Sequence, residues 1–581
     1  MSSTPSHKPR GKRRRNELSS LGVGPGIVRI RNGVQQPGFP LVAFLWPAKG
    51  ASQWIVLPCV LMVAALFRWA TGFWGYSGFR SPPMHGDFEA QRHWMEITTH
   101  LPISQWYFYE LLWWGLDYPP MTAYHSWILG KIGSQFDPTW FALDASRGLD
   151  DPGLKVYMRA TVLISEYLTY ILFIIGFVRR YLRRQHVDLW DSNIALTAVL
   201  MQPATLLIDH GHFQYNTVML GFAVACMSNL VQEKYALSCV DFVICLSFKQ
   251  MGLFYAPAVF AYLLGSCIFP RINISRFLRI AITTVVAFAG VFAPLILGSL
   301  FDAKRGIQVP QVPTPPLLKA LPVVIDERAW YYPPMLQIAQ AIHRIFPFAR
   351  GLFEDKVANI WCTIHTFHKL HVYPSSTVQR LALAATTTAI IPPCTILLLR
   401  PRKDLILLGF STVAWAFFLC SYQVHEKNVL LPLLPMTLLL TGKNGLSSSV
   451  RSWVGFANML GSWTMFPLLK RDELRVPYFI LTLLWAYLLG LPPVSLSAYK
   501  NDERGGVGLF SKLVHLTCYT AMIAWHIAEA FVKPPQGKPD LWVVGNVLLG
   551  AAGFGLCYLW CLWNLVLRSG LLRLGMRSKD A

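Results

Sequence analysis

The feature that most constrains this chain is a succession of apolar segments, most of them about as long as a membrane is thick, separated by short polar stretches. Of the 581 residues, 54% are hydrophobic and only 14% are charged, which is too apolar for a water-soluble protein of this size. A helix needs about 20 residues to cross the hydrocarbon core of a bilayer. The sequence therefore predicts an all-α polytopic membrane protein with the lipid bilayer as its solvent.

Basic clusters between the apolar segments set the predicted orientation. The net charge of +22 collects in clusters such as residues 179–184 and 400–403, so it indicates membrane topology rather than a nucleic-acid partner, and no nucleic acid is expected. Because lysine and arginine favour cytosolic loops, we predict about fourteen spans with both termini in the cytosol. One stretch, residues 468–475, is basic yet falls on the external side. The spans lie near 54–74, 158–178, before 208, before 232, before 248, before 270, 280–300, 380–400, before 422, 429–441, 451–467, 476–497, 513–532 and 540–567.

The same pattern divides the chain into a tail, a membrane domain and two long external loops. Residues 1–50 are predicted to be a basic, disordered cytosolic tail, and residues 568–581 a second cytosolic tail. The transmembrane catalytic domain spans residues 51–567, with long loops at 75–157 and 301–379 that carry interfacial helices. The eleven cysteines lie mostly inside apolar segments, as small core residues do, and form no metal-binding or disulfide pattern.

All the stretches that look chemical, namely GDFEAQRHW, LDYPP, DHGHFQYN, FKQ, IHRIFPFARGLFEDK and QVHEKN, fall on the external side in this topology, whereas the cytosolic loops are short and basic. An alternating-access transporter would instead place polar groups near the midplane and show a repeat between its halves, and no such repeat is visible. The sequence therefore favours an enzyme with its active site outside the cytosol, with a lipid or sugar transporter as the alternative from another class.

The stretch GDFEAQRHW, residues 86–94, follows the first apolar segment and is predicted to open a helix. One interpretation makes Asp87 a carboxylate general base at the helix N-terminus, facing a water-filled cleft. The alternative is that Asp87 only caps the helix. Within the helix, Asp87 and Gln91 share a face, as do Glu89 and His93.

Two further motifs have both a chemical and a structural interpretation. In LDYPP, residues 116–120, Asp117 either binds sugar hydroxyls or caps the helix that follows the two prolines. In DHGHFQYN, residues 209–216, the polar set either binds a phosphate or sugar or caps a helix at the interface. His210 and His212 are only weak evidence for a metal site without a third ligand, and neither a metal nor a cofactor is expected.

Cationic groups at other helix ends are candidates for binding an anion. Lys249 and Gln250 end one span, and His425, Glu426 and Lys427 end another; together they would suit a phosphate, although a lone lysine at this depth commonly snorkels. Residues 342–362 form either an interfacial amphipathic segment or a phosphate contact through Arg350 or Lys356. The proline-rich region at 309–334 is predicted to be a loop insertion with little order.

These motifs, with HRIFPFARGLFEDKVAN and SYQVHEKN, resemble the dolichyl-phosphate-glucose-dependent α-1,3-glucosyltransferases of N-glycan precursor assembly, glycosyltransferase family 57. The resemblance covers most of residues 50–567. It implies a GT-C fold and transfer of glucose from dolichyl phosphate glucose to the terminal mannose of Man9GlcNAc2-PP-dolichol, with inversion. The reaction would take place in the endoplasmic reticulum lumen. The paralogous reaction, which adds a second glucose to Glc1Man9GlcNAc2-PP-dolichol, is the alternative, and a monomer is a compatible assembly.

The resemblance also assigns roles to residues. Asp87 would be the catalytic base, and His425, Lys427, Lys249, Arg350 and His212 would offset the charge of the leaving phosphate. A single displacement needs no second carboxylate as nucleophile, so Asp117 is expected to bind substrate. The full predicted substrate-binding set is Glu89, Arg92, His93, Asp117, Tyr118, Asp209, His210, His212, Gln214, Tyr215, Asn216, Lys249, Gln250, Arg350, His425, Glu426 and Lys427.

Overall fold

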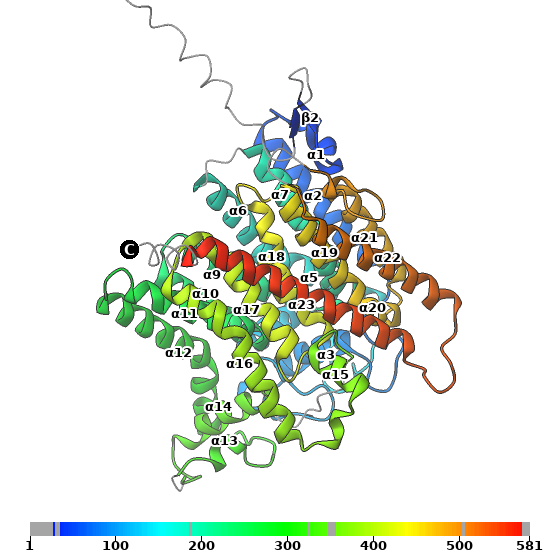
Figure 1. The fold of residues 1–581 in the computed structure, drawn as a ribbon. Helices are drawn as coiled ribbons and strands as arrows, with labels where there is room; N and C mark the ends of the chain where they lie inside the picture. Colours follow the sequence, from blue (N-terminus) through cyan, green and yellow to red (C-terminus); the bar gives the residue numbers. More distant parts are fainter. Residues whose placement is uncertain are drawn as a thin grey trace, which may run out of the picture.

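The computed structural model describes residues 27–29, 35–184, 189–322, 325–346, 356–501 and 506–571, and this part of the chain is almost entirely helical (Figure 1). The only strands in it are β1 (Ile27–Arg29) and β2 (Gln35–Pro37), which pair antiparallel with Ile27 opposite Pro37. The helices of eight or more residues are α2 (Gln53–Thr71), α3 (Asp87–His100), α4 (Pro120–Phe136), α5 (Pro152–Glu166), α6 (Leu172–Arg184), α7 (Leu189–Leu200), α9 (Asn216–Val231), α10 (Tyr235–Phe248), α11 (Ala256–Ile268), α12 (Ile274–Lys304), α14 (Tyr332–Ile345), α15 (Ile360–Phe367), α16 (Ser375–Leu399), α17 (Ile406–Cys420), α18 (Leu430–Leu438), α19 (Ser448–Thr464), α21 (Arg475–Leu489), α22 (Leu509–Phe531) and α23 (Leu541–Ser569).

Short elements join these helices. Two are π-helical, η5 (Tyr167–Ile171) and η6 (Leu206–Phe213). The short α-helices are α1 (Pro40–Leu45), α8 (Pro203–Thr205), α13 (Pro316–Lys319) and α20 (Phe466–Arg471), and the 3-10 turns are η2 (Trp46–Ala48), η3 (Ile103–Gln105), η4 (Pro138–Phe141), η7 (Gln250–Tyr255), η8 (Leu370–Val372), η9 (Lys403–Leu405), η10 (Glu426–Val429), η11 (Leu439–Thr441) and η12 (Ser497–Tyr499).

Each of the fourteen apolar segments of the sequence contains a helix, and eight helical stretches are long and apolar enough to cross a membrane. Three further apolar helices, α9, α10 and α21, are shorter. The eight are Trp54–Thr71, Pro152–Tyr181, Leu189–Phe213, Gln250–Ile268, Ile274–Lys304, Ser375–Leu399, Lys403–Cys420 and Leu541–Ser569. The chain is thus a polytopic all-α membrane protein, as the sequence predicts.

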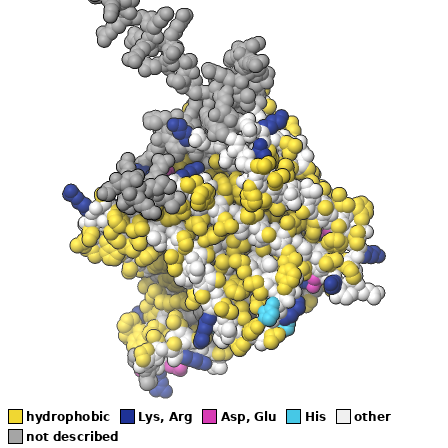
Figure 2. Space-filling model, in the orientation of Figure 1, with side chains coloured by type: hydrophobic (Ala, Val, Ile, Leu, Met, Phe, Trp, Pro, Cys, Tyr) yellow, Lys and Arg dark blue, Asp and Glu magenta, His cyan; other side chains and the backbone are white. Residues whose placement is uncertain are grey.

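The outer surface has the composition expected of a lipid-facing protein. Hydrophobic side chains cover the middle of the face in Figure 2, and lysine and arginine side chains lie mainly toward its edges. On α12, for example, Ile282 is 61% exposed and Val285 is 68% exposed. Apolar area of this extent is costly in water and is solvated by lipid chains, so α12 lies at the periphery of the bundle.

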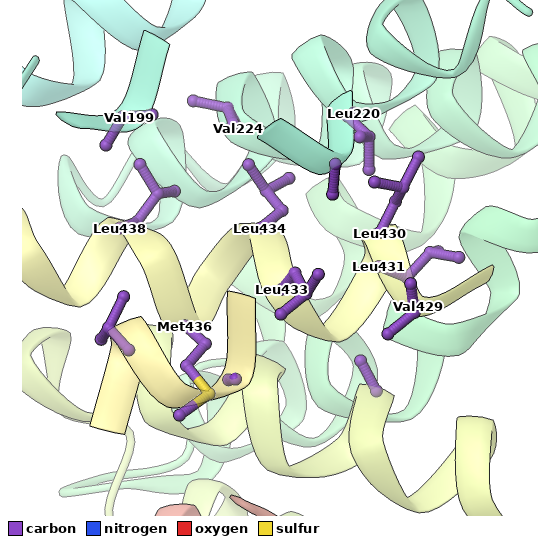
Figure 3. Close-up of a cluster of buried hydrophobic side chains, with 14 of the residues drawn as sticks. Val199, Leu220, Val224, Val429, Leu430, Leu431, Leu433, Leu434, Met436 and Leu438 are labelled. Carbon is purple, nitrogen blue, oxygen red and sulfur yellow. The ribbon is translucent and has the colours of Figure 1, made fainter. Parts of the chain in front are cut away.

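A leucine-rich helix, α18, lies in the interior of the bundle. All nine residues of α18 are buried, and its side chains meet Val199 of α7 and Leu220 and Val224 of α9 (Figure 3). This helix also packs against α17 and α19. Because η10 immediately precedes α18, the rigid packing of α18 fixes the position of His425 to Asn428.

The two long loops pack on one another. In the first, α3 packs against α4, and α4 is not among the eight membrane-length stretches. The second contacts the first where Ser104 N donates to Asp302 Oδ2 at 3.1 Å and Gln105 Nε2 donates to Gln308 O at 2.8 Å. The proline-rich stretch was expected to have little order. This prediction is wrong for residues 309–322, whose Val309 and Val312 pack into the first loop's hydrophobic cluster.

The N-terminal tail is shorter than predicted. Helix α1 buries Leu41 and Val42 completely in the main hydrophobic core, and α1 packs against α7 and α21. The prediction of disorder up to residue 50 is therefore wrong for residues 40–50, because α1 is apolar enough to dock on the bundle. The basic run between Lys8 and Arg15 lies outside the described residues.

Candidate active site

Asp87 is the first residue of α3, and a glycine places it there. Gly86 has no room for a Cβ, which would lie 2.5 Å from Ser77 Oγ and 2.6 Å from Gly78 N. The backbone N–H of Asp87 donates to Ser77 Oγ at 3.1 Å. The side chain makes no cap bond to α3, so the interpretation of Asp87 as a helix cap is wrong. The helix N-terminus still favours the negative charge of the carboxylate.

Three donors converge on one oxygen of the Asp87 carboxylate. His212 Nε2 donates to Oδ2 at 2.8 Å, Gln214 Nε2 donates to it at 2.6 Å, and Lys427 Nζ donates to the same atom. From the described residues, the other oxygen, Oδ1, accepts no hydrogen bond. The carboxylate, 22% exposed, is therefore fixed through one oxygen and free to accept a proton at the other.

The electrostatic surroundings keep Asp87 ionised. Burial raises the pKa of the Asp87 carboxyl, but the charge of Lys427 and the hydrogen bond from His212 outweigh it. The net pKa lies well below the usual value of 3.8. Asp87 is therefore a carboxylate at neutral pH, the state that a general base requires.

The π-helical turn η6 carries two of the three donors. Its last residue, Phe213, has a left-handed backbone with φ of 84°, and Gln214 is extended. This change of direction lets His212 and Gln214, two residues apart, reach the same carboxylate oxygen. Single π-turns are frequent at functional sites, and no pattern in the DHGHFQYN stretch indicated one.

Buried ionic groups hold η6 in place. Arg159 of α5 donates to His210 O at 2.5 Å, Gly211 O at 2.9 Å and Gly75 O at 3.0 Å. The ring of His210 contacts Glu166 at 2.5 Å, and Glu166 forms a two-point ion pair with Arg68. Gly211 lies against Leu474, where a Cβ would come within 2.9 Å of the leucine side chain. The backbone of η6 is thus bonded to α5, and the side chain of His210 is linked through Glu166 to Arg68 of α2.

The other nitrogen of His212 contacts a residue that the sequence did not indicate. Asp472, which follows α20, accepts from His212 Nδ1 at 2.5 Å. It belongs to the basic stretch 468–475, which lies beside Asp87 and therefore on the same side of the molecule, as the predicted orientation requires. The only feature of the sequence that pointed to Asp472 was the predicted position of residues 468–475 on the external side of the membrane.

Lys249 lies behind the carboxylate site rather than at a lipid boundary. Its side chain is completely buried, and Nζ donates to Gln214 Oε1 at 3.0 Å and to Asn216 Oδ1 at 2.6 Å, 4.8 Å from the centre of the Tyr118 ring. The snorkelling interpretation is therefore wrong. By accepting at Oε1, Gln214 is oriented with its amide N–H toward Asp87.

A cavity of about 510 Å³ opens in front of Asp87. Its lining combines ionisable, aromatic and apolar side chains. Ionisable groups on it are Asp87, Asp117, His212, His425, Glu426, Lys427 and Arg471; aromatic ones include Trp94, Trp114 and Tyr118; apolar ones include Met251, Leu253, Phe254, Phe417, Val424 and Leu468. Such a space suits a ligand that joins a sugar and an anionic group to a hydrocarbon chain.

About half of the predicted substrate-binding residues line this cavity. Those on its wall are Asp117, Tyr118, His212, Gln214, Gln250, His425, Glu426 and Lys427. Asp117 is not the cap of α4, since the residue at that position is Pro119 and no side chain caps the helix, so its capping interpretation is wrong. Arg471, Trp94 and Trp114 are lining residues that the motif analysis missed.

The remaining predicted residues lie elsewhere. Arg92 pairs with Glu89 at 2.6 Å and with Glu96 at 2.7 Å, and His93 contacts Glu96 at 3.1 Å. Burial raises the pKa of Glu96, but the hydrogen bond from His93 and the charge of Arg92 lower it to about 2. Asp209 accepts from Asn216 Nδ2 and Thr217 N, His210 contacts Glu166, and Tyr215 meets Thr161. Arg350 lies outside the described residues.

Comparison with known proteins gives one consistent result. Residues 59–313 and 317–563 match the family model described as the ALG6, ALG8 glycosyltransferase family. A relative from Schizosaccharomyces pombe, named "Probable dolichyl pyrophosphate Man9GlcNAc2 alpha-1,3-glucosyltransferase", is 42% identical over 91% of this chain and 95% of its own length. A relative from Saccharomyces cerevisiae, named "Dolichyl pyrophosphate Man9GlcNAc2 alpha-1,3-glucosyltransferase", is 41% identical over 90% of this chain and 94% of its own length. A relative of the same name from Gallus gallus is 34% identical over 85% of this chain and 93% of its own length.

Because the family model covers most of the chain and these relatives align nearly from end to end, the chain belongs to the ALG6, ALG8 glycosyltransferase family.

Proposed function

We propose that this protein transfers glucose from dolichyl phosphate glucose to the terminal mannose of Man9GlcNAc2-PP-dolichol in α-1,3 linkage, with inversion, for protein N-glycosylation. The observation that carries the proposal is Asp87. It is an ionised carboxylate that is held through one oxygen and lines a cavity whose other lining residues include charged, aromatic and apolar side chains. Family membership supplies the glycosyl-transfer chemistry.

The proton step falls to Asp87. A sugar hydroxyl is a poor nucleophile, and a carboxylate that takes its proton as the new bond forms contributes about 10²- to 10⁴-fold to the rate. Since Oδ2 already accepts three hydrogen bonds, the proton of the acceptor hydroxyl would go to Oδ1. Inversion follows from a single displacement, in which the acceptor oxygen attacks the anomeric carbon from the face opposite the phosphate.

The departing lipid phosphate needs positive charge beside it. Lys427, His425 and Arg471 line the cavity that Asp87 faces. Charge-assisted hydrogen bonds from such groups to phosphate are strong, and they act where negative charge grows in the transition state. The wall formed by Leu253, Phe254 and Phe417 would take the first isoprene units of the dolichyl chain.

The aromatic side chains that line the cavity are suited to binding the transferred glucose. Trp94 and Tyr118 lie with ring centroids 4.6 Å apart, and Trp94 Nε1 donates to Trp114 O at 2.8 Å. Their flat faces can cover a pyranose ring. Asp117 and Gln91 also line the cavity and can form hydrogen bonds with the hydroxyl groups of the sugar. In this arrangement Asp117 binds substrate and takes no proton from the acceptor.

For the membrane arrangement, we propose the GT-C fold with about fourteen spans and a monomeric protein. We place it in the endoplasmic reticulum membrane, with the active site on the luminal side and both termini in the cytosol. Asp87 and Asp472 contact His212, and Lys427 contacts Asp87. His212 lies at the end of the membrane-length stretch Leu189–Phe213, and Lys427 follows the stretch Lys403–Cys420, which supports a one-sided active site. The same grouping disfavours a transporter, since transport sites lie near the midplane.

The test is glucose transfer by the purified protein in detergent, with synthetic dolichyl phosphate glucose and a Man9GlcNAc2 lipid acceptor. We expect transfer by wild type and a loss of at least about 100-fold in kcat for Asp87→Asn. Glu110→Gln is the matched control, because Glu110 is an exposed carboxylate of the same loop away from the cavity.

Three outcomes would count against the proposal. Transfer only to a Glc1Man9GlcNAc2 acceptor would identify the second-glucose reaction instead. Full activity of a folded Asp87→Asn protein would remove Asp87 as the base. A loss of activity on addition of chelator would contradict charge compensation by Lys427, His425 and Arg471 alone.

A further inference from the structure

The imidazole of His212 lies between two carboxylates. Its Nδ1 is 2.5 Å from Asp472 Oδ2, and its Nε2 is 2.8 Å from Asp87 Oδ2. His212 is 2% exposed and Asp472 is 3% exposed. The three side chains come from the segment after α20, from η6 and from the start of α3, so the chain brings them together only through its fold.

Hydrogen-bond chemistry restricts the protonation of this histidine. An ionised carboxylate only accepts hydrogen bonds, and a neutral imidazole carries one N–H. With a carboxylate at each nitrogen, both contacts are satisfied only when both nitrogens carry a proton. The positive imidazolium is then balanced by Asp472 on one side and Asp87 on the other, while Lys427 Nζ lies 3.4 Å from Nε2.

The backbone around Asp472 is closely packed, which fixes its carboxylate. A Cβ on Gly75 would lie 2.4 Å from Asp472 O, and Gly75 O itself accepts from Arg159 Nη2 at 3.0 Å. Two residues on, Leu474 lies against Gly211 of η6. A buried carboxylate is costly unless it is paired, and here the partner of Asp472 is the histidine that contacts the proposed base.

We propose that Asp472 is a positioning residue for glucosyl transfer. It keeps His212 protonated at both nitrogens and oriented with Nε2–H on Asp87 Oδ2, so that Oδ1 remains aimed into the cavity to take the acceptor proton. The role rests on the proposed function above and adds a residue to it that none of the sequence motifs contains.

Replacing Asp472 by asparagine removes the charge and keeps the shape. The amide oxygen of Asp472→Asn can still accept from Nδ1–H, so a neutral His212 would keep its single proton there. Nε2 would then present a lone pair to Asp87 Oδ2, and the carboxylate would lose one of its three fixing bonds. Orientation of the base acts in the transition state rather than in substrate binding, so kcat falls while KM stays.

The experiment compares the kinetics of wild type, Asp472→Asn, His212→Gln and the double variant in detergent, with dolichyl phosphate glucose and the Man9GlcNAc2 lipid acceptor. We expect Asp472→Asn to lower kcat by about 10- to 100-fold, the usual range for a residue that orients a functional ligand, with each KM within about twofold. Glu473→Gln is the matched control, since Glu473 is the exposed neighbour, and it should retain wild-type rates.

The double variant separates positioning from general damage. If Asp472 acts through His212, Asp472→Asn changes kcat by less than about twofold in the His212→Gln background, because coupled residues are not additive. Additive losses, or a change confined to KM, would overturn the proposal, and so would unchanged activity of Asp472→Asn. Where Asp472→Asn does not purify as monodisperse protein, Asp472→Ser takes its place with the same expected loss.

Two further results are distinguishable. If neither Asp472 variant accumulates as folded protein, the residue serves folding and the positioning role falls. If wild type and Glu473→Gln themselves transfer no glucose, the proposed function fails, and the positioning role for that reaction fails with it.

Discussion

At the scale of single residues, the site combines Asp87, the proposed base, with a cation that lowers its basicity. The ion pair with Lys427 holds the pKa of Asp87 well below 3.8 after burial has raised it, and a carboxylate of low pKa is a poor proton acceptor. A donor phosphate beside Lys427 would share that cation. The basicity of Asp87 would then rise when the donor is bound, at the step where the base is needed.

Replacing Lys427 by methionine should therefore change the pH profile. In the folded wild-type protein the pKa of Asp87 is lower than the usual 3.8, so the carboxylate stays ionised at neutral pH. The ion pair therefore stabilises the fold above pH 3.8, and this stabilisation is lost as the pH falls from 3.8 through the pKa of Asp87 in the folded protein. Loss of one close opposite charge raises a carboxyl pKa by about 1 to 3 units. We expect the acid limb of kcat/KM to move upward by about that amount and the donor KM to rise.

The measurement is kcat/KM in detergent from neutral pH to below 3.8, the usual pKa of an aspartate carboxyl, a range that includes the acid limb expected for the variant. Lys369→Gln, at an exposed lysine of the second loop, is the control and should keep the wild-type profile. A Lys427→Met protein with an unshifted acid limb and an unchanged donor KM would contradict both roles of this lysine.

Sequence reasoning singled out Asp87, the proposed base, and all three of its hydrogen-bond donors, but it could not find Asp472. Asp87, His212 and Lys427 sit in polar runs that stand out against apolar neighbours. Asp472 lies in a stretch whose arginines and lysine suggested an ordinary basic loop. Its importance depends on a contact 260 residues away in the chain, and no local pattern encodes such a contact.

At the scale of elements, α3 has two faces with different tasks. Its N-terminal residue lies in the cavity, while Arg92 holds the helix against the rest of the loop. Arg92 is completely buried, pairs with Glu89 and Glu96, and donates to Ser146 Oγ at 2.5 Å. Spacing on a helix predicted which residues share a face, but not which face meets substrate and which meets protein.

Arg92→Met should therefore reduce stability more than substrate binding. Removing one member of a buried ionic network typically costs about 3–5 kcal/mol, so we expect a clearly lower Tm and unchanged donor and acceptor KM for the folded fraction. The measurement is thermal unfolding by intrinsic fluorescence alongside kinetics. Arg147→Met is the control, because Arg147 belongs to a partly exposed ion pair of the same loop, where the expected cost is about 0–1 kcal/mol.

A raised KM with unchanged Tm would instead support the prediction that Arg92 binds substrate.

The presence of helices was predicted more reliably than their caps. Every apolar segment contains a helix, because length and apolar composition suffice for that. Asp87 and Asp117 are not caps, because each carboxylate lies on the cavity instead.

At the scale of the whole molecule, the proposed orientation in the membrane rests on the positions of the basic turns and of the candidate active site. The basic turn at Arg271 joins α11 to α12, and the turn at Gly537 joins α22 to α23. Asp540 in the second turn pairs with Lys356 of the second long loop, which places that turn with the loops that carry the site. The sequence predicted this grouping from alternation and the positive-inside rule, while the number of crossings depends on short helices that hydropathy alone does not decide.

A pair of single-cysteine additions tests the orientation. In sealed endoplasmic reticulum vesicles, a membrane-impermeant maleimide should label Arg271→Cys but should label Gly537→Cys only after detergent opens the vesicles. Both positions are exposed, and wild-type protein gives the background from its eleven native cysteines. Equal labelling of both variants in intact vesicles would overturn the luminal assignment.

The catalytic group is also spread along the chain in a way that matters during synthesis. Asp87, the His212 and Gln214 pair, Lys427 and Asp472 enter the nascent protein in that order, and the last arrives after residue 470. A ribosome-bound fragment that ends before Lys427 carries Asp87, His212 and Gln214 but lacks both Lys427 and Asp472. The proposed catalytic group is therefore complete only after Asp472 has been added, so a chain truncated by a premature stop before Asp472 is expected to lose activity.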